Sequence, residues 1–271
     1  MQTGQSLLLL CGLPRLEARM LLECVLDKPR EWLLAHDTDP LAPEDVAKFL
    51  TLAAQRRQGV PMAHLIGWRE FMGHRFEVTP VVLIPRPETE LLVEVALASL
   101  DGCTEPAVLD MGTGSGIVAI CLALARPDAR VTATDLSVEA LTLAQRNAQA
   151  LSARIQWWQG SWFEALPSEG RFKLIVSNPP YIAAQDEHLQ RGDLRFEPAQ
   201  ALTDGLDGLS ALAQIISGAG PHLLPGGCLW LEHGYDQAEA VGLMLARAGF
   251  TAVQTHTDLA NLPRVTGGVW K

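Results

Sequence analysis

The chain has few cysteines, and their arrangement excludes two common roles. Its 271 residues include five cysteines, with no Cys-x-x-Cys pair and no Cys/His cluster at the spacing of a zinc site. An odd, scattered set of thiols is typical of a protein whose cysteines stay reduced, and not of a secreted disulfide scaffold. We therefore expect a cytoplasmic protein that binds no metal.

Basic residues are scarce too, and long apolar runs are missing. Lys and Arg number 21 against 31 Asp and Glu, which gives a net charge of −10. Such a chain gains little from long-range attraction to a nucleic-acid backbone, so a protein or small-molecule partner is favoured. No run is long enough to span a membrane. The apolar run 6–11 resembles a lipoprotein signal, but it is short, follows no Lys or Arg, and has the large Leu10 before Cys11. We predict a helix there and no membrane partner; we also expect a monomer.

What the chain has in quantity is apolar side chains, at 48% of its residues, which suffice for a full core. Its length suggests one large or two medium domains. Residues 1–63 have the pattern of a small helical bundle, with helices at 16–25, at 30–35, and from Pro43 to near Gly59. No catalytic constellation is visible in this bundle.

A connector follows the bundle. Two β-like runs, 64–71 and 74–78, flank Met72-Gly73 and predict a hairpin within a connector at 64–84. A helix is predicted at 91–100, just inside a second domain that spans residues 85–271.

In the second domain, strands alternate with helices. The predicted strands are 107–111, 131–135, 155–159, 173–177, 226–232, 250–257 and 264–270, and the predicted helices are 116–125, 137–150, one starting near Asp207, and 236–248. This order predicts an α/β fold with a mainly parallel, Rossmann-like sheet and helices on both faces. Ligands of such sheets bind at the carboxyl ends of the strands.

A glycine-rich turn follows the first of these strands. Its pattern, Asp110-Met111-Gly112-Thr113-Gly114-Ser115-Gly116, differs from the G-x-G-x-x-G of nicotinamide-binding proteins. Asp135 ends the next strand, 19 residues after Gly116, where a carboxylate can accept both hydroxyls of a ribose. S-adenosylmethionine has no pyrophosphate but carries an ammonium and a sulfonium. An acidic, glycine-rich site suits that cation better than a dinucleotide.

A second motif, Asn178-Pro179-Pro180-Tyr181, follows the buried strand at 173–177. The prolines end the strand and stiffen the turn, because each has a fixed φ and no N–H. The Asn oxygen and a backbone carbonyl can then accept both N–H groups of a planar amide or amine, while the Tyr ring covers its face. The tetrapeptide alone is equally compatible with a plain strand-ending turn. In this context it resembles the nitrogen-methylating branch of the methyltransferases.

The chain as a whole resembles the peptide-chain-release-factor glutamine N5-methyltransferases. The resemblance covers essentially its full length, and the bundle is the least specific part. The segments that carry it are Leu83-Ile84-Pro85-Arg86-Pro87-Glu88-Thr89-Glu90 with the hairpin before it, the glycine-rich turn, Ser177-Asn178-Pro179-Pro180-Tyr181-Ile182, Glu197-Pro198, Asp204-Gly205-Leu206-Asp207-Gly208-Leu209, Leu224-Pro225-Gly226-Gly227 and Glu232-His233-Gly234.

This resemblance implies a methyl transfer from S-adenosylmethionine to the side-chain amide of the glutamine in the Gly-Gly-Gln motif of release factors. The bundle would contact the release factor. The residues implied in cofactor binding are Gly112, Thr113, Gly114, Ser115, Gly116, Asp135 (ribose), Trp162 (adenine) and Asn178. Those implied in glutamine binding are Asn178, Pro179, Pro180 and Tyr181, of which Asn178, Pro179 and Tyr181 would be catalytic.

The expected chemistry depends on position. An amide nitrogen is a poor nucleophile because its lone pair is delocalised, and the motif has no strong base. The site must therefore work by orientation and electrostatics. Asn178 and the Pro179 carbonyl would bind both amide hydrogens as positive charge develops on nitrogen, and would aim it at the sulfonium methyl for an in-line displacement.

Several residues keep a plainer interpretation. From spacing alone, Trp162 fills a loop core, Asp110 is a turn residue or a cofactor contact, and Glu197 is a solvated acid rather than one that orients the loop after Tyr181. The role of Arg86 is open. His233 is expected to be a structural hydrogen-bonding histidine and not a base.

Three other functions compete. A methyltransferase acting on the amino group of adenine or guanine in nucleic acid would use the same turn, usually on a flipped base; the acidic charge opposes it. A binding protein without activity is disfavoured by the intact motifs. A nicotinamide oxidoreductase is disfavoured by the glycine spacing.

Overall fold

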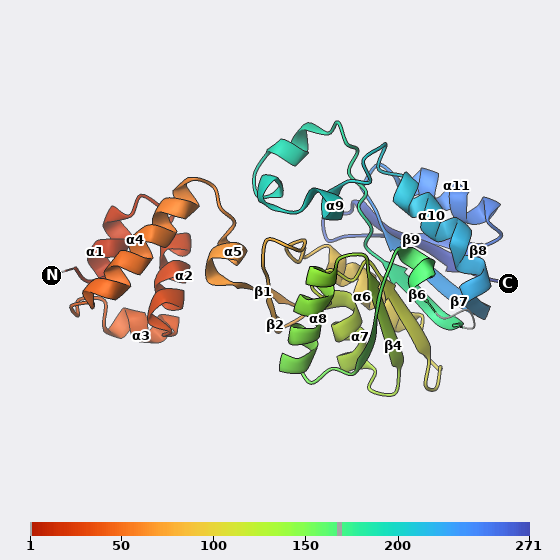
Figure 1. Cartoon of the computed structure of the whole chain (residues 1–271), viewed down its shortest axis with the longest axis horizontal. Coiled ribbons are helices and arrows are strands. Elements are labelled where there is room, and N and C mark those ends of the chain that lie inside the picture. Colours follow the sequence, from red (N-terminus) through yellow and green to blue (C-terminus); the bar gives the residue numbers. More distant parts are fainter. Residues whose placement is uncertain (1, 167–169) are drawn as a thin grey trace. The chain divides into compact units, whose positions relative to one another are not determined.

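The computed structural model describes residues 2–166 and 170–271, which form two compact units (Figure 1). The first unit comprises Met1–Trp68 with Arg191–Phe196, and the second comprises Arg69–Gln190 with Glu197–Lys271. In the described residues, no helix combines the length and apolar character needed to cross a membrane.

The first unit is the predicted helical bundle. Its helices are α1 (Gly4–Leu10), α2 (Arg15–Leu26), α3 (Arg30–Ala35), α4 (Pro43–Arg57) and α5 (Met62–Ile66). Leu7, Leu21, Leu22 and Phe49 are buried together in its core. The short helix α5 corrects the β-like run expected from residue 64. Pro61 precedes the helix, and Gly67, at a φ of 82°, ends it, so extended backbone begins only at Trp68.

The segment Arg191–Phe196 joins this unit although it lies far away in sequence. Arg195 donates a hydrogen bond of 3.0 Å to the carbonyl of Gln58, and Asp193 lies 3.8 Å from the Arg56 guanidinium. Arg56 also forms a two-pronged ion pair with Glu17, at 2.8 and 2.7 Å. Sequence patterns gave no indication of these contacts, because they join residues up to 137 positions apart.

The second unit begins with the predicted hairpin, β1 (Trp68–Phe71) and β2 (His74–Glu77). It continues into a sheet whose strands are β3 (Ala107–Met111), β4 (Arg130–Asp135), β5 (Ile155–Gln159), β6 (Phe172–Ser177), β7 (Leu223–Glu232), β8 (Thr251–Thr257) and β9 (Pro263–Val269). Among the described residues the sheet order is β5-β4-β3-β6-β7-β9-β8, parallel except for the antiparallel β9. The predicted mainly parallel sheet is confirmed.

The order of strands reverses between β3 and β6. From β3 the chain moves outward through β4 and β5, and then returns to place β6 on the other side of β3. This reversal opens a crevice at the carboxyl ends of the two strands, which is where ligands of such sheets bind.

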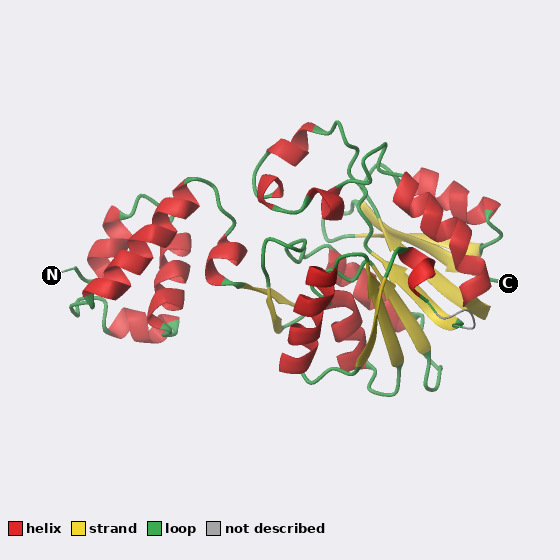
Figure 2. Ribbon diagram, in the orientation of Figure 1, coloured by secondary structure: helices red, strands yellow, loops and turns green. Residues whose placement is uncertain are grey.

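Helices cover both faces of the sheet (Figure 2). They are α6 (Thr89–Ala98), α7 (Ile117–Ala125), α8 (Val138–Ala150), α10 (Ser210–Ala219) and α11 (Ala238–Arg247). The short helix α9 (Ala199–Leu202) lies in the long connection between β6 and α10. Val108 packs into the core beneath α6 and α7, and its neighbour Leu109 packs into the core beneath α10 and α11. Successive residues of a strand point to opposite faces, so a strand buried on both faces has a continuous apolar sequence.

Candidate active site

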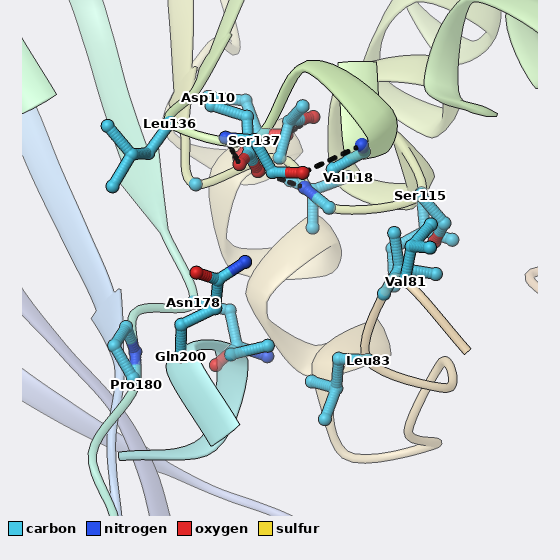
Figure 3. A pocket seen from close by; sticks show the side chains of 18 of the residues that line it. Val81, Leu83, Asp110, Ser115, Val118, Leu136, Ser137, Asn178, Pro180 and Gln200 are labelled. Atoms are coloured by element: carbon cyan, nitrogen blue, oxygen red, sulfur yellow. Dashed lines mark hydrogen bonds between the residues drawn. The ribbon is translucent and has the colours of Figure 1, made fainter. Parts of the chain in front are cut away.

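A cavity lies at the carboxyl ends of β3, β4 and β6, entirely within the second unit (Figure 3). It holds about 1100 Å³ of empty space, its open mouth included. Its walls come from the glycine-rich turn, the start of α8, the segment 81–85, the loop at 160–162, the turn after β6, and α9. Figure 3 shows the Asn178 side chain directed into this space. The structure thus gathers most of the predicted site residues around one cavity.

Residues 112–115 and Asp135 form one side of the cavity, and Gly116 is not among the described lining residues. We call residues 112–116 together with Asp135 the glycine edge. The Asp135 carboxylate accepts hydrogen bonds from the backbone N–H of Gly114, at 2.8 Å, and of Ser137, at 2.9 Å. Burial raises the pKa of Asp135, and these N–H donors oppose the rise. The φ of 56° at Gly114 suits glycine, and it lets this N–H turn toward the carboxylate.

Asp110 is buried behind the glycine edge and also lines the cavity. Its Oδ2 accepts hydrogen bonds from the Thr113 hydroxyl, at 2.6 Å, and from the N–H of Ala119 in the first turn of α7, at 3.1 Å. Burial raises the pKa of Asp110 to about 6. The residue therefore holds the turn against the helix, as the turn interpretation expects, and it also places a carboxyl beside the cavity. A contact with the cofactor stays a prediction.

Trp162 combines a packed side chain with a place in the cavity wall. Its indole N–H donates to Gln214 at 2.9 Å, and its ring lies against Gly112, where an added Cβ would sit 3.6 Å from it. Its φ of 42° is in the left-handed region, which bulky side chains rarely adopt. Such a conformation is kept where the surroundings fix it, often at functional sites.

Asn178 faces the glycine edge across the cavity. Its Nδ2 donates to the Thr89 hydroxyl at 3.1 Å, while its Oδ1 accepts no hydrogen bond from the described residues. An acceptor oxygen is thereby presented to the cavity. Pro180 also lines this wall, whereas Pro179 and Tyr181 are not among the lining residues that the structure describes.

The Tyr181 side chain contacts a buried carboxylate. Its hydroxyl donates to Glu232 Oε1 at 3.3 Å, and burial raises the pKa of the phenol far above its usual value. The role of Tyr181 as a wall for an acceptor amide stays a prediction.

Thr89 and Glu232 complete the surroundings of Asn178, and sequence reasoning gave neither of them a role. We call Thr89, Asn178 and Glu232 the asparagine edge. Thr89 is the first residue of α6, Glu232 is the last of β7, and each is about 1% exposed. Burial raises the pKa of Glu232 to about 7, while hydrogen bonding from Thr89 and Tyr181 opposes the rise. Its Oε2 makes no hydrogen bond of good geometry among the described residues.

One signal could have indicated Glu232. The parallel register pairs Ser177 of β6 with Leu231 of β7, so Asn178 and Glu232 each come one residue later, at the same end of the sheet. A carboxylate at the end of an apolar strand is a candidate site residue for that reason.

Glu197 holds the end of the segment 81–85, which lines the cavity, through contacts with Ile84 and Arg86. The Glu197 side chain is fully buried, accepts the N–H of Ile84 at 2.8 Å and pairs with Arg86. The interpretation of Glu197 as a solvated acid is therefore wrong. The loop after Tyr181 folds back onto the segment 84–86, 111 to 113 positions away in sequence, and a local pattern does not reveal such a contact.

Neither His233 nor any other described residue belongs to a group of three or more His, Cys, Asp and Glu side chains that could hold a metal ion. The His233 ring is buried between the Gly234 carbonyl, at 2.8 Å, and the Thr266 hydroxyl, at 2.7 Å. Burial lowers the pKa of His233, so the ring is a neutral structural group, as expected.

Two family models and many curated relatives match the chain. Residues 1–67 match the family described as "PrmC N-terminal domain", and residues 87–205 match "Methyltransferase small domain". A release factor glutamine methyltransferase of Bordetella pertussis is 60% identical over 95% of both chains. One of Burkholderia pseudomallei is 50% identical over 98% of this chain and 95% of its own.

Solved structures share the fold. A Pyrococcus furiosus methyltransferase aligns with a TM-score of 0.54 at 17% identity, over 84% of this chain and 98% of its own. The T. thermophilus 16S rRNA N2 G1207 methyltransferase, solved with AdoMet and guanosine, also gives 0.54, at 24% identity, over 75% of this chain and 51% of its own.

Proposed function

The chain belongs to the release factor glutamine methyltransferase family, and we propose that it methylates the side-chain amide nitrogen, N5, of the glutamine in the Gly-Gly-Gln motif of peptide chain release factors, with S-adenosylmethionine as methyl donor. The observation that carries this proposal is the Asn178 amide, whose nitrogen is engaged by Thr89 while its oxygen is offered to the cavity.

The described residues fit S-adenosylmethionine at the glycine edge. The Asp135 carboxylate lies at the end of β4, where it can accept ribose hydroxyls with lone pairs that Gly114 and Ser137 do not use. Trp162 and the exposed Leu136 provide apolar surface for an adenine. The bound cofactor supplies a methyl group on a positively charged sulfur.

The acceptor glutamine is best placed at the asparagine edge. The Asn178 oxygen and the Pro179 carbonyl would accept the two N–H bonds of the glutamine amide. This arrangement fixes the orientation of the nitrogen and stabilises the positive charge that develops there. In this proposal Pro180 stiffens the turn, and Tyr181 lies beside the acceptor, as the sequence motif implies.

The first unit is the proposed contact for the release factor. Its sequence matches the amino-terminal domain of the family. It also exposes apolar side chains that its own core leaves uncovered, with Leu9 and Leu10 each 77% exposed. A protein substrate would cover such surface.

The test is mass spectrometry of a purified release factor after incubation with this protein and S-adenosylmethionine. We expect one added methyl group on the motif glutamine and none on a control factor in which alanine replaces that glutamine. If the cofactor binds but the factor stays unmodified, while labelled methyl appears in RNA or DNA, the acceptor is a nucleic acid.

A further inference from the structure

We infer that Thr89 and Glu232 are positioning residues that decide which end of the Asn178 amide faces the acceptor. This inference rests on the proposed function. Thr89 also lines the cavity, whereas Glu232 is not among the described lining residues. Neither residue would touch the reacting atoms, and both would act through Asn178.

The orientation of Asn178 matters because the two ends of its side-chain amide have similar shapes and opposite hydrogen-bonding character. The oxygen accepts hydrogen bonds, and the NH₂ group only donates them. An acceptor glutamine brings its own NH₂ group, so it needs the oxygen. A reversed Asn178 would place donor against donor and leave both without a partner.

Thr89 can impose the required orientation because its hydroxyl has a single hydrogen. Glu232 Oε2 is buried and receives no hydrogen bond of good geometry from the described residues, and the neighbouring Thr89 hydroxyl lowers the pKa of this carboxyl. An ionised Glu232 can only accept hydrogen bonds, so it offers an acceptor for the single Thr89 hydrogen. The Thr89 oxygen then has only lone pairs left for Asn178, and it accepts the bond of 3.1 Å from Nδ2. The Asn178 oxygen is thereby turned to the cavity.

A neutral Glu232 would remove this constraint. A protonated carboxyl can donate to the Thr89 oxygen, and the Thr89 hydrogen can then turn to the oxygen of a reversed Asn178. Two groups besides Thr89 favour the ionised form, namely the Tyr181 hydroxyl and Arg264 of β9. Burial and the nearby Glu88 favour the neutral form.

The other charged or titratable groups near Glu232 do not alter this balance between its ionised and neutral forms. Arg264 also pairs with Asp258, at 2.9 Å, and thus shares its charge between two carboxyls. His233, the residue that follows the end of β7, faces Thr266 and the Gly234 carbonyl. Because the pKa of Glu232 is raised to about 7, the ionised form that orients Asn178 is lost as pH falls through the neutral range.

The first test removes the hydroxyl without changing the shape of the side chain. We expect Thr89→Val to lower kcat for release-factor methylation on the order of 10- to 100-fold, since misplacing one group at a reacting centre has effects of that size. The Kd for S-adenosylmethionine should change less than about twofold, and Thr89→Ser should recover most of the activity. Thr142→Val, on the exposed side of α8, is the matched control.

The second test uses the pH profile. The kcat of the wild-type protein should rise with pH through about 7 as one group ionises. Glu232→Gln should show a reduced kcat without this rise, and the surface change Glu239→Gln should keep the wild-type profile. Tyr181→Phe retains the ring but removes a donor to Glu232, so it should move the rise to higher pH.

The outcomes separate the two proposals. The inference is wrong and the proposed function stands if wild-type protein methylates the release factor and Thr89→Val does so with the same kcat. The same conclusion follows if the kcat of Glu232→Gln rises with pH as that of wild type does. If Thr89→Val does not fold, Thr89→Ser and the profiles of Glu232→Gln and Tyr181→Phe decide. If wild-type protein leaves the release factor unmethylated, the proposed function fails and this inference falls with it.

Discussion

The glycine edge and the asparagine edge of the cavity are built in different ways. In the glycine edge, backbone N–H groups of Gly114 and Ser137 converge on Asp135, and neither is more than 21 positions from it. At the asparagine edge, Asn178, in the turn after β6, bonds to Thr89 of α6, 89 positions away, and Tyr181 of the same turn bonds to Glu232 of β7, 51 positions away. The glycine edge therefore depends on backbone conformation, and the asparagine edge depends on the chemical identity of side chains.

The sharpest test of this difference is Asn178→Ala. We expect kcat to fall on the order of 10²- to 10³-fold, the range found when a preorganised polar group is removed from an active site. Affinity for S-adenosylmethionine, measured by calorimetry, should stay within about twofold, because the glycine edge is intact. Gln149→Ala, on the exposed face of α8, is the control. Equal losses of turnover and cofactor affinity would contradict the proposed role.

Gly116→Ala should damage the glycine edge through the backbone. A Cβ at Gly116 would lie 3.0 Å from both Ala144 Cβ and Ile120 Cδ1, at a φ of 86°. The left-handed conformation and the overpacking together should lower the free energy of unfolding by about 3 kcal/mol. Gly102→Ala is the matched control, since Gly102 has a φ of 73° and no atom within 4 Å of the added Cβ.

Gly102→Ala should lower the free energy of unfolding by about 1 kcal/mol, which is the penalty of the left-handed conformation alone. Urea unfolding monitored by circular dichroism gives both values. If the two variants lose the same stability, close packing of α7 against α8 does not explain the requirement for glycine.

Asp135→Ala should mainly weaken cofactor binding, whereas Asn178→Ala should mainly lower kcat. Losing the proposed ribose acceptor, and with it two backbone contacts, should weaken S-adenosylmethionine binding by about 10- to 100-fold, the cost of one or two hydrogen bonds to a charged group. At saturating cofactor, kcat should change much less. Asp135→Asn, which keeps one acceptor oxygen, should lie between the two, and unchanged binding in both variants would remove Asp135 from the cofactor site.

Asp110→Asn should give the smallest effect, a change in the free energy of unfolding that depends on pH. The folded-state pKa of about 6 exceeds the unfolded value of 3.8, so the contribution of Asp110 to stability is complete below pH 3.8 and is lost as pH rises through 6. An asparagine stays neutral, and its oxygen can accept both hydrogen bonds that now reach Oδ2.

We therefore expect the ligand-free variant to exceed wild type by about 1–2 kcal/mol at pH 8, with the gain disappearing at pH 3.5. Urea titrations at the two pH values measure it. A gain of equal size at both values would show that ionisation of Asp110 is not its cause.

The glycine edge was largely predictable from the sequence. The turn, the strand before it and Asp135 lie within one short stretch, and the glycines are required by local backbone geometry, as at Gly114. The position of Asn178 was predictable for the same reason, because an apolar strand ends there and two prolines follow. The hydrogen bond from Asn178 to Thr89 and the burial of Glu232 were not predictable, since local patterns describe these two residues only as a helix start and a strand end.

The sequence by itself determined the alternation of strands and helices, the bundle that precedes it, and the two motifs at the strand ends. Residues a few positions apart control periodicity, helix caps and tight turns, so these features can be read from neighbours along the chain. Only the tertiary structure decided that Glu197 is a buried ion-pair partner of Arg86, that Arg191–Phe196 packs with the bundle, and that the Glu232 carboxylate is buried beside the Tyr181 hydroxyl. Burial and long-range hydrogen bonding depend on which strands become neighbours, and that is settled only when the sheet assembles.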